Sequence, residues 1–144
     1  MNWDEYYLTE HFTLKEMCVT SHEGFVNKPS AQQIRCLENV CCQLEKLRSA
    51  LGGRPLKISS GFRCEELNHR VGGAKNSFHT SGCAADIVCD DLNDACRKMA
   101  TMARVCVDFD ELFIEGNLKT ERVWLHFAYN PYSPPLRKCG FISK

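Results

Sequence analysis

The sequence predicts an α+β fold, with helices packed on one face of a small antiparallel sheet. Two observations lead to this prediction. Two segments carry apolar residues at helical spacing, and several short segments have the composition of strands that can pair antiparallel. A length of 144 residues fits one hydrophobic core, so we expect a single domain over residues 1–144.

A short early helix and a later helix are marked by local signals. Thr13 and Glu16 have the spacing of a capping box, which predicts a helix over residues 14–19. Another helix is predicted from Asp91 to about residue 107. Its inward positions are Ala95, Met99, Met102 and either Val105 or Cys106.

The clearest helix follows Pro29. Ser30 can cap it, Gln33 completes a second capping box, and Gly52-Gly53 ends it. Its apolar residues recur at helical spacing, which indicates a face that packs against the core and not a cofactor site. These residues are Ile34, Leu37, Cys41, Leu44, Leu47 and Leu51.

Strands and one long polar segment account for most of the remaining chain. Residues 61–82 are rich in Gly, Ser and Asn. A polar connection of this length is uncommon in a compact domain, so we expect a functional loop there. The expected strands are 56–60, 84–89, 112–115, 123–128 and 139–142.

Charge and hydropathy exclude some classes of partner. The 18 basic and 18 acidic residues balance, and no basic stripe is visible, so we expect no nucleic-acid partner. No apolar run has the length of a membrane span. The start of the chain carries Asp4, Glu5 and Glu10 and lacks the basic and apolar segments of a secretory signal. We therefore expect a soluble chain that is made in the cytoplasm.

The ten cysteines allow two interpretations. A disulfide framework is typical of small exported domains, whereas this chain can build a core without cross-links. No Cys-x-x-Cys pair is present, which argues against a zinc knuckle. We expect mostly free thiols, because several lie in apolar segments, where a thiol behaves as a small hydrophobic group. These are Cys36, Cys41, Cys89, Cys96 and Cys106.

Two of the five histidines stand apart by context. His79 lies in the polar segment, whereas His126 lies within an apolar strand. Asp86 lies within another apolar strand, where a carboxylate is costly to bury without a partner. Two His and one carboxylate form a catalytic type of zinc site, with a position left for water or substrate. The alternative is that Asp86 and His126 only hydrogen-bond each other in the core, and spacing alone does not decide between the two.

The stretch from Ser59 to Ile87 resembles the signature of the zinc D-Ala-D-Ala carboxypeptidase family, metallopeptidase family fifteen. The similarity covers nearly the whole chain, because it also includes residues 12–16 and the helix after Pro29. The matching motifs are Ser60-Gly61-Phe62-Arg63, Leu67-Asn68, Val71-Gly72-Gly73, the run from Ser77 to Asp86, and Trp124-Leu125-His126.

This resemblance implies a hedgehog-like fold and a peptidase that acts on bacterial peptidoglycan peptides. The family includes D-Ala-D-Ala carboxypeptidases and endopeptidases of phage lysis systems. The resemblance also implies one zinc ion per chain, with His79, Asp86 and His126 as its ligands. It implies that Arg63 binds a substrate carboxylate or polarised carbonyl group, with Ser77 assisting, and the fork of donors on a guanidinium suits that role.

The general base is less clearly defined by the resemblance. Relatives often place an acid shortly before the last His, but Val123 stands three residues before His126. Glu115 matches the acid that ends the preceding strand in similar sequences. Glu121 is the alternative, within an insertion over residues 116–122.

The candidate residues and the family resemblance lead to two alternative functions. The first is a zinc peptidase that cleaves peptidoglycan stem peptides, as a carboxypeptidase or an endopeptidase. The second is a noncatalytic zinc module that binds cell wall or protein, as hedgehog relatives suggest. Arg63 and Glu115 favour catalysis. Without an export signal, a phage-derived enzyme of this kind would reach the cell wall on lysis.

Overall fold

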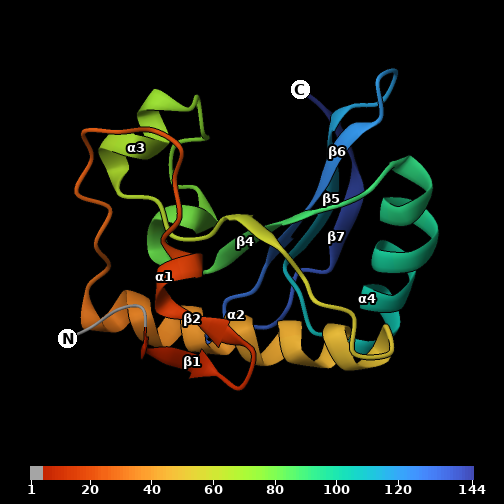
Figure 1. Cartoon of the computed structure of the whole chain (residues 1–144), viewed down its shortest axis with the longest axis horizontal. Coiled ribbons are helices and arrows are strands. Elements are labelled where there is room, and N and C mark those ends of the chain that lie inside the picture. The colour runs from red at the N-terminus through yellow and green to blue at the C-terminus, as the bar shows by residue number, and fades with distance from the viewer. Residues whose placement is uncertain (1–4) are drawn as a thin grey trace.

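A computed structural model describes residues 5–144, and Asp4 of the acidic start lies outside them. Strands and helices are interspersed along the chain, and its last three elements are strands (Figure 1). The strands are β1 Tyr7–Thr9, β2 Phe12–Thr13, β3 Ile58–Ser60, β4 Ala84–Val88, β5 Glu111–Asn117, β6 Arg122–Ala128 and β7 Lys138–Ser143. The helices are α1 Leu14–Met17, α2 Ala31–Ala50, α3 Glu65–Arg70 and α4 Thr101–Cys106, with a 3₁₀ turn at Phe78–Ser81 and a π-helical segment at Asp94–Ala100 that leads into α4.

The main sheet has five strands in the order β3-β4-β6-β5-β7. The first four strands pair antiparallel with one another, which confirms the predicted α+β class. The edge strand β7 departs from the prediction, because it runs parallel to β5. The chain leaves β6 beside the start of β5 and crosses to the other edge of β5 before β7 begins. Asp110 holds this crossing, because its carboxylate accepts hydrogen bonds from the amides of Asn130 at 2.6 Å and Leu136 at 3.0 Å.

The two faces of the sheet carry different side chains, because successive residues of a strand point to opposite faces. One face is apolar and packs with α2 and α4 to form the core. Figure 1 shows α2 along the bottom of the view and α4 at the right of the sheet. In the three central strands this face includes Ile87, Leu112, Ile114, Leu125 and Phe127. The alternate positions, which include Asp86 and His126, point to the other face, where a polar site can form.

The two predicted capping boxes are confirmed, whereas the helix predicted from Asp91 corresponds to the π-helical segment Asp94–Ala100 followed by α4. Thr13 and Ser30 cap α1 and α2, and each forms the complete capping box with the residue three positions on, Glu16 or Gln33. The prediction of a loop over residues 61–82 is wrong in part, because α3 and the 3₁₀ turn interrupt it. The first turn of α3 is acidic and its last turn is basic, which suits the helix dipole, but six residues are too few for an apolar stripe. The β1–β2 hairpin was also not expected.

All ten cysteines are free thiols, as predicted. Five of them are buried, so they act as apolar side chains. Burial raises the pKa of Cys18, Cys83 and Cys89 to about 12. Within residues 5–144, no helix combines the length and the apolar character that crossing a bilayer requires.

Candidate metal centre

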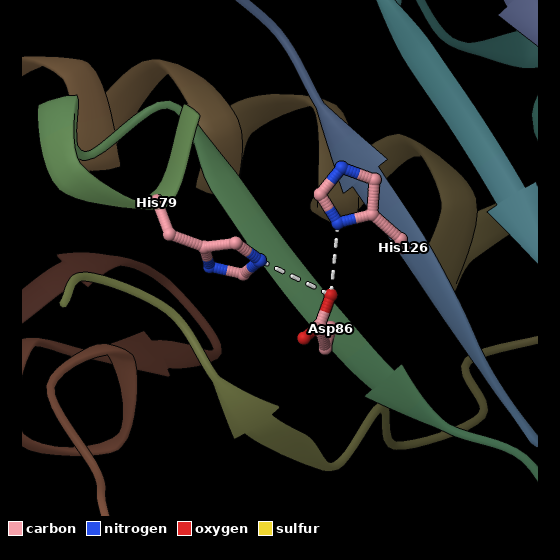
Figure 2. A group of neighbouring side chains, drawn as sticks. All are labelled: His79, Asp86 and His126. Carbon is pink, nitrogen blue, oxygen red and sulfur yellow. Dashed lines mark hydrogen bonds and ion pairs between the residues drawn. The ribbon is translucent and has the colours of Figure 1, made fainter. Parts of the chain in front are cut away.

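His79, Asp86 and His126 meet at one point on the polar face of the sheet (Figure 2). One ligand atom from each lies within 4.8 Å of the others. The Oδ1 atom of Asp86 lies 3.3 Å from Nε2 of His79 and 3.0 Å from Nδ1 of His126. Asp86 and His126 are directly paired across β4 and β6, so the sheet register itself brings them together. All three side chains are buried.

The 3₁₀ turn places His79 above the sheet. Ser77 caps this turn, because its hydroxyl oxygen accepts a hydrogen bond from the amide of His79 at 3.1 Å. The turn ends at Gly82, which has a φ of 79° and lies close to α2. A Cβ at this position would lie 2.6 Å from the carbonyl oxygen of Gln33, so only glycine fits. Gln33 also donates to the carbonyl oxygen of Thr80, which ties the turn to the start of α2.

The hydrogen bonds of the two imidazoles define which nitrogens face the centre. Nδ1 of His79 lies 2.6 Å from the carbonyl oxygen of Gly61, which can only accept, so Nδ1 carries a proton. In neutral His79, Nε2 then presents a lone pair to Asp86. Nε2 of His126 lies 2.9 Å from Oε1 of Glu111, so its Nδ1 presents a second lone pair in the same way.

This arrangement requires a cation between the three side chains. Two imidazole lone pairs and a carboxylate oxygen are all acceptors, and their close approach is unfavourable unless a proton or a metal ion lies between them. A set of two imidazole nitrogens and one carboxylate oxygen is the ligand set of catalytic zinc sites. The residues therefore fit a zinc ion. A simple hydrogen bond between Asp86 and His126 does not account for the third member, His79.

The pKa values of the centre reflect the same arrangement. Burial alone would raise the pKa of Asp86, but electrostatic interactions with the neighbouring His79 and His126 outweigh it and hold that pKa well below its usual range. Burial would lower the pKa of His126, but hydrogen bonds to Asp86 and Glu111 raise it to about 9. The centre thus keeps Asp86 ionised and, without a metal, binds a proton at His126.

Arg63 lies beside the centre and has three partners. Its Nε donates to the hydroxyl of Ser60 at 2.9 Å, and one terminal nitrogen donates to Oδ1 of Asn68 at 3.1 Å. The other terminal nitrogen donates to Oδ2 of Asp86 at 3.3 Å, which leaves Oδ1 for the centre. A guanidinium has five N–H groups, so two remain for a ligand. Arg63 therefore positions Asp86, a contact that the sequence did not reveal.

Asn27 is a second residue that sequence reasoning missed. Its amide nitrogen donates to the carbonyl oxygens of Cys18 and Phe62, at 3.0 and 2.9 Å. Its amide oxygen accepts from the backbone N–H of Cys64 at 2.7 Å. Asn27 thus holds the backbone on both sides of Arg63. No motif surrounds it, so only the folded chain reveals this role.

The two predicted candidates for the base occupy different environments. Glu115 is buried on β5, and its Oε1 accepts a 3.0 Å hydrogen bond from Nε1 of Trp124. It lines the same cleft as His79 and His126. Glu121 is exposed at the tip of the β5–β6 hairpin and accepts a hydrogen bond from the amide of Leu92. It does not line that cleft.

A cleft of about 360 Å³ opens over the centre. Its volume is in the range of sites that bind small molecules or peptides. Arg63 and Ser77, the two predicted substrate-binding residues, both lie in its wall. Lys75 and Lys144 add positive charge to the wall, while Glu111 and Glu115 add negative charge.

The fold and the site together define a class of protein, one whose side chains could hold a single metal ion of the catalytic kind at the base of a cleft. Comparison with known proteins agrees with this class. The family described as Peptidase M15 matches residues 10–127, and the chain belongs to that family. The chain is also similar to a protein named zinc D-Ala-D-Ala carboxypeptidase from Streptomyces albus G, with 36% identity over 78 residues. That match covers 54% of this chain and 31% of the relative, so the similar region is about a third of the relative's length.

Proposed function

We propose that the protein is a zinc peptidase that hydrolyses peptide bonds in the stem peptides of bacterial peptidoglycan. The observation that carries the proposal is the convergence of His79, Asp86 and His126 below a cleft that also contains a buried carboxylate, Glu115. Membership of a peptidase family supports the reaction class, and the name of the similar carboxypeptidase supports the substrate class.

In this proposal the three side chains hold one zinc ion. Bound zinc supplies a Lewis acid that polarises a carbonyl group and makes water acidic enough to act as a nucleophile near neutral pH. The residues around it must orient a peptide, exclude competing solvent and move one proton. The charged wall of the cleft suits a substrate that carries carboxylate and amino groups.

Glu115 is the proposed proton carrier. It takes a proton from the attacking water and delivers it to the amine that leaves when the peptide bond breaks. The hydrogen bond from Trp124 fixes one of its oxygens, so the other can face the reacting groups in a defined orientation. Glu121 does not suit this role, because its carboxylate lies on an exposed hairpin tip and is bound to the backbone of Leu92.

Arg63 has two proposed roles. It keeps Asp86 oriented through the 3.3 Å contact to Oδ2. Its remaining N–H groups bind a substrate carboxylate or carbonyl oxygen in the cleft, where Ser77 assists. The lining of the cleft is compatible with both an exopeptidase and an endopeptidase, so the bond that is cleaved must be identified by experiment.

Digestion of purified peptidoglycan tests the proposal. The zinc-loaded protein is incubated with intact sacculi and with soluble stem peptides, and the products are identified by mass spectrometry. Release of free D-Ala indicates a carboxypeptidase, whereas release of cross-linked or internal fragments indicates an endopeptidase. Glu115→Gln serves as the inactive control. If the wild-type protein binds zinc and cleaves neither substrate, the noncatalytic zinc module becomes the better interpretation.

A further inference from the structure

We propose that Glu111 is a positioning residue for the metal centre, which orients His126 and fixes the nitrogen that His126 presents to the metal. This inference rests on the proposed metal site, but not on the peptidase reaction. The sequence analysis did not single out Glu111, because an acid at the start of a strand is commonly exposed. In the structure its side chain is 24% exposed and contacts His126 directly.

The sheet register explains the contact. Phe113 of β5 is paired with His126 of β6, and Glu111 lies two residues before Phe113 on the same face of β5. Glu115 lies two residues after Phe113, so one acid flanks His126 on each side. Of these two glutamates, Glu111 is the one hydrogen-bonded to the imidazole, with 2.9 Å between its Oε1 and Nε2 of His126. Glu115 is instead hydrogen-bonded to Trp124.

Two contacts from β5 help to hold the imidazole of His126 in place. The ring of Phe113 stacks against it, with 5.9 Å between the ring centroids and 13° between the planes. This stacking restricts the plane of the imidazole but does not distinguish its two nitrogens. The hydrogen bond to Glu111 distinguishes them, because a carboxylate can only accept a hydrogen bond, so Nε2 must carry the proton. Nδ1 is then free of a proton and faces Asp86 and the metal position.

The two histidines of the centre have different orienting partners. His79 donates to the carbonyl oxygen of Gly61, a neutral acceptor, whereas His126 donates to a charged one. A carboxylate makes the imidazole a stronger electron donor to a metal, and loss of such a partner typically weakens metal binding 10- to 100-fold. We therefore expect the metal affinity to depend on Glu111, although Glu111 is not itself a ligand.

Three variants test this role through metal binding alone. Glu111→Ala removes the acceptor, Glu111→Gln keeps a neutral acceptor, and Glu66→Ala is a matched control on the exposed surface of α3. Zinc affinity is measured by competition with a chromophoric chelator. We expect about 10- to 100-fold weaker binding for Glu111→Ala, a smaller loss for Glu111→Gln, and a wild-type value for Glu66→Ala.

Nitrogen-15 NMR of the zinc-loaded protein gives a second readout. In wild type, the Nε2–H proton of His126 should exchange slowly and give a resolved signal, and in Glu111→Ala that signal should be lost. Both readouts are independent of peptidase activity, so a wild-type protein that binds zinc without cleaving peptidoglycan would contradict the proposed function and leave this inference standing. If both Glu111 variants bind zinc with affinities within twofold of that of Glu66→Ala, the positioning role of Glu111 is overturned.

Discussion

Trp124 donates a hydrogen bond from its indole Nε1 to Oε1 of Glu115, with 3.0 Å between the two atoms. The two residues are paired across β5 and β6, so the sheet itself sets their separation. Trp124 lies two positions before the ligand His126, on the same face of β6. The Trp-x-His motif therefore supplies a proposed metal ligand and also orients the proposed proton carrier.

Removal of that carboxylate should abolish most of the activity and leave the metal centre intact. We expect Glu115→Gln to keep normal zinc content and to lower turnover roughly 100-fold or more, the usual scale for loss of a general acid–base group. The amide can still accept from Trp124, so thermal stability should change little.

The matched variant is Glu121→Gln. Glu121 is exposed on the hairpin, so we expect turnover within about threefold of wild type. Steady-state kinetics on the peptidoglycan fragment identified as the substrate measure both variants. A large loss for Glu121→Gln with full activity for Glu115→Gln would transfer the role to Glu121.

Arg63→Lys should keep the fold and bind zinc but lower turnover about tenfold or more. A lysine ammonium cannot reproduce three separately directed contacts, and a lost hydrogen bond to a charged group corresponds to a rate change of this size. Arg70→Lys on α3 is the control, because Arg70 is exposed. Equal kinetics for the two variants would remove Arg63 from the site.

The stability of the metal-free protein should depend on pH through His126. Its pKa is raised from 6.5 to about 9 in the folded chain, mainly because hydrogen bonds to Asp86 and Glu111 outweigh burial. A raised pKa means that the folded state holds the proton more tightly, so this stabilisation is full below about pH 6.5 and is lost as the pH rises through about 9.

Urea denaturation of chelator-treated protein at pH 6 and pH 9 tests this. Wild type should lose more stability over this range than His126→Gln, which lacks the titrating group. The buried thiols titrate in both proteins and cancel in the comparison. An equal loss in the two proteins would show that His126 is not held as a cation in the metal-free state.

Reaction with a thiol reagent should separate the cysteines by burial. Cys42 and Cys139 are exposed and should react at once in the native protein, whereas Cys18, Cys83 and Cys89 are buried, with pKa values of about 12, and should react only on unfolding. Unfolded, unreduced protein should give a total close to ten thiols. A total of one or two would indicate disulfides.

The meeting of Asp86 and His126 could be anticipated from the sequence, because both are polar residues in apolar strands, a costly placement that points to a shared partner. Spacing alone did not decide between a metal site and a simple hydrogen bond, and the choice of His79, Asp86 and His126 as ligands came from the family resemblance. The residues that support the proposed ligands could not be predicted from the sequence. Glu111 contacts His126 only because of the β5–β6 register, and Asn27 reaches the backbone beside Arg63 from 35 residues away in sequence. The direction of β7 depends on the crossing that Asp110 holds. Each of these depends on distant parts of the chain meeting, which local patterns do not encode.

The most direct test of the metal centre is a titration of peptidoglycan hydrolysis with zinc. Protein stripped by a chelator should be inactive, and activity should rise linearly and stop at one equivalent of zinc per chain. His126→Ala, treated in the same way, should retain no zinc after gel filtration and recover no activity. Full activity of the stripped wild-type protein, or full zinc occupancy in His126→Ala, would contradict the assignment of His79, Asp86 and His126 as the catalytic zinc site.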